Sequence, residues 1–184
     1  MGVGTIRRAI FLDRDGVLNQ AVIRDGKPYP PQTAADVRLV DGAADGLRRL
    51  QSLGFLLLVA TNQPDVARGT QTMEELSAIN QVLQDALPLD AMLICPHDSA
   101  DACECRKPKP GLLLAGAREF GLALETCYMI GDRWRDMDAA AAAGVAGVWI
   151  DYGYAEREPA VPPAARVKNL RDAVDWIVNQ ESRS

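Results

Sequence analysis

The chain has 184 residues, of which 48% are hydrophobic and 24% charged, a size and composition typical of one globular domain with its own core. The formal net charge of −5 argues against broad nucleic-acid binding, and no apolar run is long enough to span a bilayer or form a signal peptide. We therefore expect one cytoplasmic domain over residues 1–184, without nucleic-acid or membrane partners.

Strand patterns recur along the chain. The apolar run from Ala9 to Leu12 predicts a buried strand, and residues 17–40, which contain several prolines and no clear period, predict a loop or small flap. Four later apolar runs predict strands at 55–60, 89–94, 127–130 and 145–150. Residues 151–165 are rich in proline and predict a further loop.

Helices are predicted between and after these strands, at 42–53, 73–86, 110–120, 136–143 and about 170–179. The expected N-caps include Asp41, Asn169 and Thr72, the last with Glu75 in a capping box. Alternation of strands and helices at these lengths predicts an α/β fold, in which helices cover both faces of a Rossmann-like parallel sheet.

Polar side chains follow four of the predicted strands. Asp13 and Asp15 come directly after the first strand, and Thr61 follows the second. Lys107 comes after the third strand, and Asp132 after the fourth. The carboxyl ends of parallel strands share one edge of a sheet, so these side chains should converge there. The acidic pair alone fits a solvated turn equally well, and this convergence favours catalysis.

These side chains favour phosphoryl chemistry. Carboxylate oxygens suit Mg²⁺, while the Thr61 hydroxyl and the Lys107 ammonium suit phosphoryl oxygens. One carboxylate can attack phosphorus to form an aspartyl phosphate, and a second, two residues on, can donate a proton to the leaving oxygen and later take one from water. The sequence therefore predicts phosphoryl transfer assisted by magnesium.

A cysteine cluster at residues 95–105 predicts a zinc-binding loop. Cys95, Cys103 and Cys105 lie within eleven positions of each other, and His97 is the only histidine in the chain. Three thiolates and one imidazole match a closed tetrahedral zinc site, which has no open position for water and is therefore structural. The alternative is a set of free cysteines near an incidental histidine. Cys127 lies in an apolar run and is expected in the core.

Four segments resemble, in order, the motifs of the haloacid dehalogenase (HAD) superfamily. They are Phe-Leu-Asp-Arg-Asp-Gly at 11–16, Thr-Asn-Gln at 61–63, Cys-Arg-Lys-Pro at 105–108 and Gly-Asp-Arg-x-x-Asp at 131–136. The resemblance extends over residues 10–150. It is strongest to the zinc-containing histidinol-phosphate and heptose-bisphosphate phosphatases, and it implies a HAD-like fold with a minimal cap.

The resemblance also implies roles for individual residues. Asp13 would be the nucleophile and Asp15 the general acid and base, while Thr61 and Lys107 would steady the phosphoryl group. Magnesium would be held by Asp13, the backbone carbonyl of Asp15 and Asp132. Asp136 either supports the metal site from behind, orienting water or Lys107, or is an acid favoured by the helix N-terminus.

Substrate recognition is implied less directly. The candidate substrate-binding residues are Asn62, Gln63, Arg106 and Arg133, and Asn62 is also expected to fix its turn. The run at 62–69 resembles the heptose-bisphosphate enzymes, except at Pro64 and Asp65, and favours heptose 1,7-bisphosphate 7-phosphatase activity. The short zinc loop and Arg133 are more similar to the histidinol-phosphate enzymes, so hydrolysis of that or another small sugar phosphate is the alternative.

Two other classes of protein remain open. A catalytically inactive, zinc-stabilised binding module would account for the cysteines but not for the acids and the lysine. A nucleic-acid end phosphatase would need a basic groove lined by aromatic residues, and only 5% of the chain is aromatic. We expect a monomer that acts on a small phosphorylated sugar.

Overall fold

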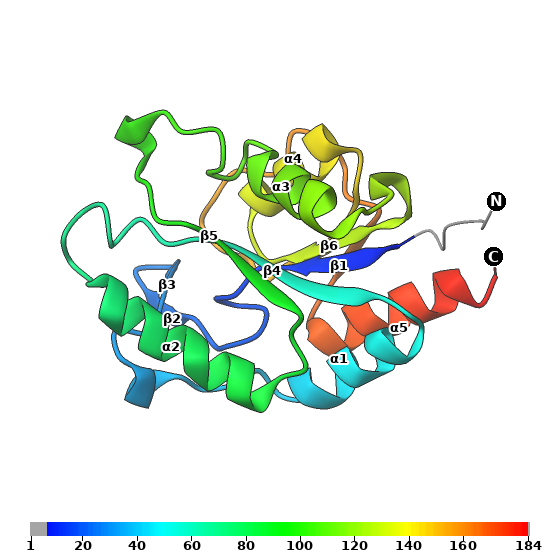
Figure 1. Cartoon of the computed structure of the whole chain (residues 1–184), viewed down its shortest axis with the longest axis horizontal. Coiled ribbons are helices and arrows are strands. Elements are labelled where there is room, and N and C mark those ends of the chain that lie inside the picture. Colours follow the sequence, from blue (N-terminus) through cyan, green and yellow to red (C-terminus); the bar gives the residue numbers. More distant parts are fainter. Residues whose placement is uncertain (1–6, 184) are drawn as a thin grey trace.

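A six-stranded parallel sheet forms the centre of the computed structural model, which describes residues 7–183. Figure 1 shows this sheet between two layers of helices. Its strands are β1 (Ala9–Leu12), β4 (Leu56–Asn62), β5 (Ala91–Cys95), β6 (Tyr128–Gly131), β7 (Ala146–Ile150) and β8 (Ala165–Val167). The order is β5-β4-β1-β6-β7-β8, and every neighbouring pair is parallel. The five predicted strands are present, with ends displaced by at most two residues. The short strand β8 was not predicted.

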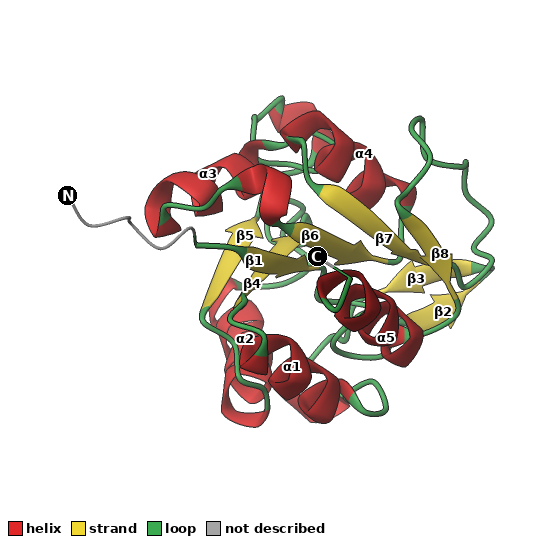
Figure 2. Ribbon diagram, turned by 90° about the vertical axis from the view of Figure 1, so that its right-hand side faces the viewer, coloured by secondary structure: helices red, strands yellow, loops and turns green. Residues whose placement is uncertain are grey.

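Helices cover both faces of the sheet, as predicted (Figure 2). One face is covered by α1 (Ala43–Ser52), α2 (Met73–Ala86) and α5 (Leu170–Glu181), and the other by α3 (Gly111–Phe120) and α4 (Trp134–Ala143). Successive side chains of a strand point to opposite faces. In β1, Ile10 and Leu12 therefore pack in the core of the first face, and Phe11 packs in that of the second. Within residues 7–183, no helix is long and apolar enough to cross a membrane.

The helix ends agree with the predicted caps except at α1. The Thr72 hydroxyl accepts the backbone N–H of Glu75, and the Asn169 side chain accepts that of Asp172. The prediction that Asp41 caps α1 is wrong, because the N-cap is Gly42. Its φ of 75° lies in the left-handed region, which glycine adopts without the steric cost of a Cβ.

Residues 17–40 form a small flap over the strand ends. It contains an antiparallel hairpin of β2 (Val22–Arg24) and β3 (Lys27–Tyr29), followed by the 3₁₀ helix η1 (Ala34–Asp36). Two other short 3₁₀ helices, η2 (Ser99–Asp101) and η3 (Leu124–Thr126), lie in the loops before α3 and β6. The second hairpin strand lines the same pocket as Asp13, so the flap interpretation of this segment is confirmed.

Candidate active site

A pocket of about 270 Å³ opens at the carboxyl ends of the central strands. Its lining includes the predicted site residues Asp13, Asp15, Thr61, Asn62, Arg106, Lys107, Arg133 and Asp136. β1 and β4 carry the first four to the pocket, the two residues directly after the cysteine loop at 95–105 are the next two, and the segment from β6 into α4 carries the last two. The topology therefore brings together residues that are more than 120 positions apart in the chain.

Lys107 lies at the bottom of this pocket between two carboxylates. Its Nζ is 3.0 Å from Oδ1 of Asp13 and 2.6 Å from Oδ1 of Asp136, and it donates to the Ala60 carbonyl. Burial opposes its charge, but Asp13 and Asp136 outweigh burial and raise the pKa of Lys107. The Asn62 amide exchanges two hydrogen bonds, of 2.9 and 3.0 Å, with the Lys107 backbone. Asn62 thus fixes the turn that presents the lysine.

The environment of Asp13 disfavours the ionised form of its carboxyl group. Its side chain is buried beside Asp136, and Asp15 is a near neighbour in the chain. Burial and then the Asp136 carboxylate raise the pKa of Asp13 to about 6, against the opposing effect of Lys107. The Asp13 N–H donates to the Ile130 carbonyl, which ties this residue to β6. Positive charge supplied by a bound cation would relieve this crowding.

A buried hydrogen-bond network holds Asp15. The Arg14 guanidinium donates to both Asp15 oxygens, and it is itself fully buried beside the Asn80 and Gln63 side-chain oxygens. Gln63 donates to Asp15 at 2.8 Å and to the Thr61 hydroxyl at 2.9 Å. Gln63 is 1% exposed and is not among the residues that line the pocket, so it lies behind the site and supports Asp15.

Three carboxylates form a candidate metal site. One oxygen each from Asp13, Asp132 and Asp136 lies within 4.8 Å of the others. Asp136 uses both oxygens, one for Lys107 and one for the backbone N–H of Arg133. Oδ1 of Asp132 is buried without a hydrogen-bond partner among the described residues. Burial and the charges of Asp13 and Asp136 raise the pKa of Asp132 well above its ordinary value. Such a set fits a hard divalent cation held mainly by Asp13 and Asp132.

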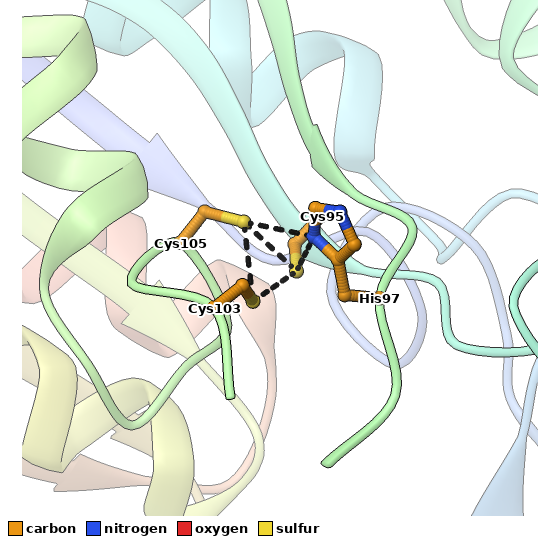
Figure 3. Close-up of side chains that lie close together, drawn as sticks. All are labelled: Cys95, His97, Cys103 and Cys105. Carbon is orange, nitrogen blue, oxygen red and sulfur yellow. Dashed lines mark hydrogen bonds between the residues drawn. The ribbon is translucent and has the colours of Figure 1, made fainter. Parts of the chain in front are cut away.

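The predicted zinc ligands converge (Figure 3). The three Sγ atoms of Cys95, Cys103 and Cys105 are 3.2–3.7 Å apart, and Nδ1 of His97 is 3.3 Å from Cys105 and 3.7 Å from Cys95. A Zn–S bond of about 2.3 Å in tetrahedral geometry separates two sulfurs by roughly 3.8 Å. These residues therefore fit a zinc ion with His97 bound through Nδ1.

The zinc loop is attached directly to the pocket. Arg106 follows the last cysteine and donates to the His97 carbonyl at 3.0 Å, and Lys107 comes next. A side chain at Gly111 would overlap the Glu104 carbonyl oxygen, so the loop packs closely on the start of α3. Cys127 lies apart from this cluster, buried in the core between the sheet, α3 and α4, as expected.

Five cationic side chains surround the pocket: Lys27, Arg68, Arg106, Arg133 and Arg135. Arg133 pairs with Glu156, and Arg68 pairs with Asp98 at 2.8 Å. Among the described residues, Lys27 has no ion-pair partner. Sequence reasoning did not select Lys27 or Arg135, because the hairpin and the start of α4 reach the pocket only in the folded chain. It did not select Arg68 either, which lies in the loop between β4 and α2.

Comparison with known proteins identifies the family. The chain is 34% identical over 181 residues to the D-glycero-β-D-manno-heptose-1,7-bisphosphate 7-phosphatase of Helicobacter pylori strain J99. The aligned region covers 94% of this chain and 98% of that protein. The chain belongs to this phosphatase family. The enzyme of that name from Escherichia coli K12 is 33% identical over 184 residues, which cover 93% of this chain and 88% of its own.

A family model and a solved crystal structure also match this chain. A HAD-hydrolase-like family model matches residues 104–173. The fold matches the crystal structure of D,D-heptose 1,7-bisphosphate phosphatase from B. bronchiseptica complexed with magnesium and phosphate, with a TM-score of 0.76 and 28% identity over 95% of this chain and 99% of that one. The predicted HAD-like fold and family are confirmed. The chain is a phosphoric monoester hydrolase.

Proposed function

We propose that this phosphatase removes the 7-phosphate of D-glycero-β-D-manno-heptose 1,7-bisphosphate, the substrate in the names of its relatives from H. pylori and E. coli. The observation that carries the proposal is the pocket itself, which has Asp13 and Lys107 at the bottom and five cationic side chains around them. The bottom suits the phosphate that is hydrolysed, and the surrounding cations suit a second phosphate. Histidinol phosphate has only one phosphate. It also carries a positively charged amine, and the same cations would repel this amine.

In the first step, the Asp13 carboxylate attacks phosphorus and the bond from phosphorus to the sugar oxygen breaks. Asp15 donates a proton to that oxygen, so the sugar leaves as an alcohol and an aspartyl phosphate remains. Arg14 and Gln63 hold the Asp15 carboxyl in place for this transfer. The positive charge of Lys107 neutralises the phosphoryl oxygens, and the Thr61 hydroxyl orients them by donating a hydrogen bond.

In the second step, Asp15 takes a proton from water, which attacks phosphorus, and the bond from phosphorus to Asp13 breaks. Inorganic phosphate leaves, and Asp13 is restored. Asp13, the backbone carbonyl of Asp15 and Asp132 would hold Mg²⁺, whose positive charge stabilises the transferring group. Asp136 would act from behind these ligands by fixing Lys107, to which it is bonded at 2.6 Å.

The cysteine cluster would hold a structural zinc ion through Cys95, His97, Cys103 and Cys105. Its contribution is rigidity, because the next two residues, Arg106 and Lys107, both line the pocket. Arg106 and Arg133 are proposed to contact the substrate, whereas Asn62 and Gln63 act by positioning Lys107 and Asp15.

A substrate screen tests the proposal. Phosphate release with saturating Mg²⁺ is measured for the two anomers of heptose 1,7-bisphosphate, histidinol phosphate and hexose monophosphates. We expect the highest kcat/KM for the β-bisphosphate, with heptose 1-phosphate as the product. A higher kcat/KM for histidinol phosphate or a hexose monophosphate would overturn the proposal that the heptose bisphosphate is the substrate. Light scattering and cell fractionation test the accompanying proposal of a cytoplasmic monomer.

A further inference from the structure

The carboxyl end of β7 and the segment after it supply three aromatic side chains to the candidate metal site. The Tyr154 hydroxyl donates to Oδ2 of Asp132 at 2.9 Å. The indole N–H of Trp149 donates to the Asp132 backbone carbonyl at 3.1 Å, and the Tyr152 hydroxyl donates to the Gly16 carbonyl at 3.0 Å. The loop after β7 therefore contacts both Asp132 and the turn after Asp13 and Asp15.

Asp132 is held from two sides. A Cβ at Gly16 would overlap Oδ2 of Asp132, so the carboxylate lies directly against the backbone of the turn. Tyr154 bonds the same oxygen. The other oxygen, Oδ1, is buried and has no hydrogen-bond partner within the described residues. One oxygen is thus committed to the protein, and one is left for a ligand.

We propose that Tyr154 is a positioning residue for the catalytic cation: its hydroxyl anchors Oδ2 of Asp132 so that Oδ1 stays available to an ion shared with Asp13. The inference rests on the proposed magnesium site. A metal-binding carboxylate is normally oriented by hydrogen bonds from residues behind it, and loss of such a partner typically weakens metal binding by about 10- to 100-fold. Within residues 7–183, Tyr154 is the side chain that donates to the Asp132 carboxylate.

Tyr154→Phe isolates the hydroxyl. The tyrosine ring also lines a second cavity, of about 740 Å³, together with Tyr152 and Gly16. Phenylalanine retains the ring that lines this cavity, while it removes the hydrogen bond to Asp132. Tyr128→Phe is the matched control, because the Tyr128 hydroxyl also donates to a carboxylate, that of Glu181, at 3.0 Å and outside the pocket.

Calorimetric titration of zinc-loaded, magnesium-free protein with Mg²⁺ tests the proposal. We expect Tyr154→Phe to raise the Kd for Mg²⁺ by about tenfold or more, and Tyr128→Phe to leave it within about twofold. The kcat of Tyr154→Phe should recover at high Mg²⁺, and its melting temperature without Mg²⁺ should fall no further than that of the control. A purely structural role would lower stability without this recovery.

Two results would overturn the inference in distinguishable ways. If the wild type binds Mg²⁺ and hydrolyses heptose bisphosphate but Tyr154→Phe binds Mg²⁺ equally well, the positioning role is wrong and the proposed function stands. If the wild type hydrolyses its substrate without binding Mg²⁺, the magnesium site itself is wrong, and this inference fails with it.

Discussion

Replacing Asp13 with asparagine should abolish turnover and, without magnesium, make the fold more stable. The physical reason is that the folded protein holds this carboxylate where ionisation is unfavourable, with a pKa raised from 3.8 to about 6 by burial and by Asp136. At about 1.4 kcal/mol for each factor of ten in proton affinity, the ionised group costs about 3 kcal/mol at pH 7. Asparagine keeps the shape and removes that cost.

The pH dependence has a definite sign. Because the folded state binds the Asp13 proton more tightly than the unfolded state does, the wild type loses stability as pH rises from about 4 to about 6. Asp13→Asn lacks this loss. Its stability advantage should therefore be about 3 kcal/mol at pH 7 and about half of that at pH 5.

Urea unfolding of zinc-loaded, magnesium-free protein at pH 5, 6, 7 and 8 measures this difference. Asp25→Asn is the control, since Asp25 is exposed in the hairpin turn, and it should gain no comparable stability at pH 7. Added Mg²⁺ should stabilise the wild type more than Asp13→Asn. If Asp13→Asn is no more stable than the wild type at pH 7, the reasoning from crowded carboxylates is refuted. Near-wild-type turnover would refute the assignment of Asp13 as the nucleophile.

Three further substitutions test other parts of the site. Lys107→Met leaves two buried carboxylates without their cation, so the free energy of unfolding in urea should fall by about 3–5 kcal/mol and phosphate release should cease. An effect no larger than that of the exposed control Lys109→Met would contradict the buried ion cluster. Cys103→Ser should lower the zinc content by elemental analysis, together with the melting temperature and activity; full zinc occupancy would contradict the ligand set. Gly16→Ala forces a Cβ onto the Asp132 carboxylate at a φ of 85°, so Mg²⁺ affinity by calorimetry should fall while zinc content is unchanged, and wild-type affinity would contradict the crowding.

The sequence was most informative about the fold where apolar runs were long enough to show a pattern. Five strands and five helices were predictable because burial imposes an apolar run on a central strand and a period of 3.6 on a covering helix. Strand β8 and the β2–β3 hairpin have three residues in each strand, too few for a period. The cap of α1 was misplaced by one residue because Asp41 is a good cap by type, whereas the backbone adopts a conformation that glycine favours.

The sequence itself determined which side chains are candidates for the site. Asp13, Asp15, Thr61 and Asp132 were identifiable as candidates because polar residues at the ends of buried strands must emerge at one edge of a parallel sheet. Lys107 was identifiable because it closes the loop that follows the next strand, β5. Three cysteines and a histidine within eleven positions likewise pointed to zinc as the candidate metal, because their short spacing alone brings the four side chains together.

Only the tertiary structure decided how these groups are held. Asn80 on α2 reaches Arg14 behind Asp15, and Tyr154 reaches Asp132 from the loop after β7. Lys27 joins the cations around the pocket through a hairpin. Such contacts depend on side-chain direction and on the distance between elements far apart in the chain, which no local pattern encodes. The residues proposed to react could be read from the ends of the predicted strands, whereas the residues proposed to position them were revealed only by the packed fold.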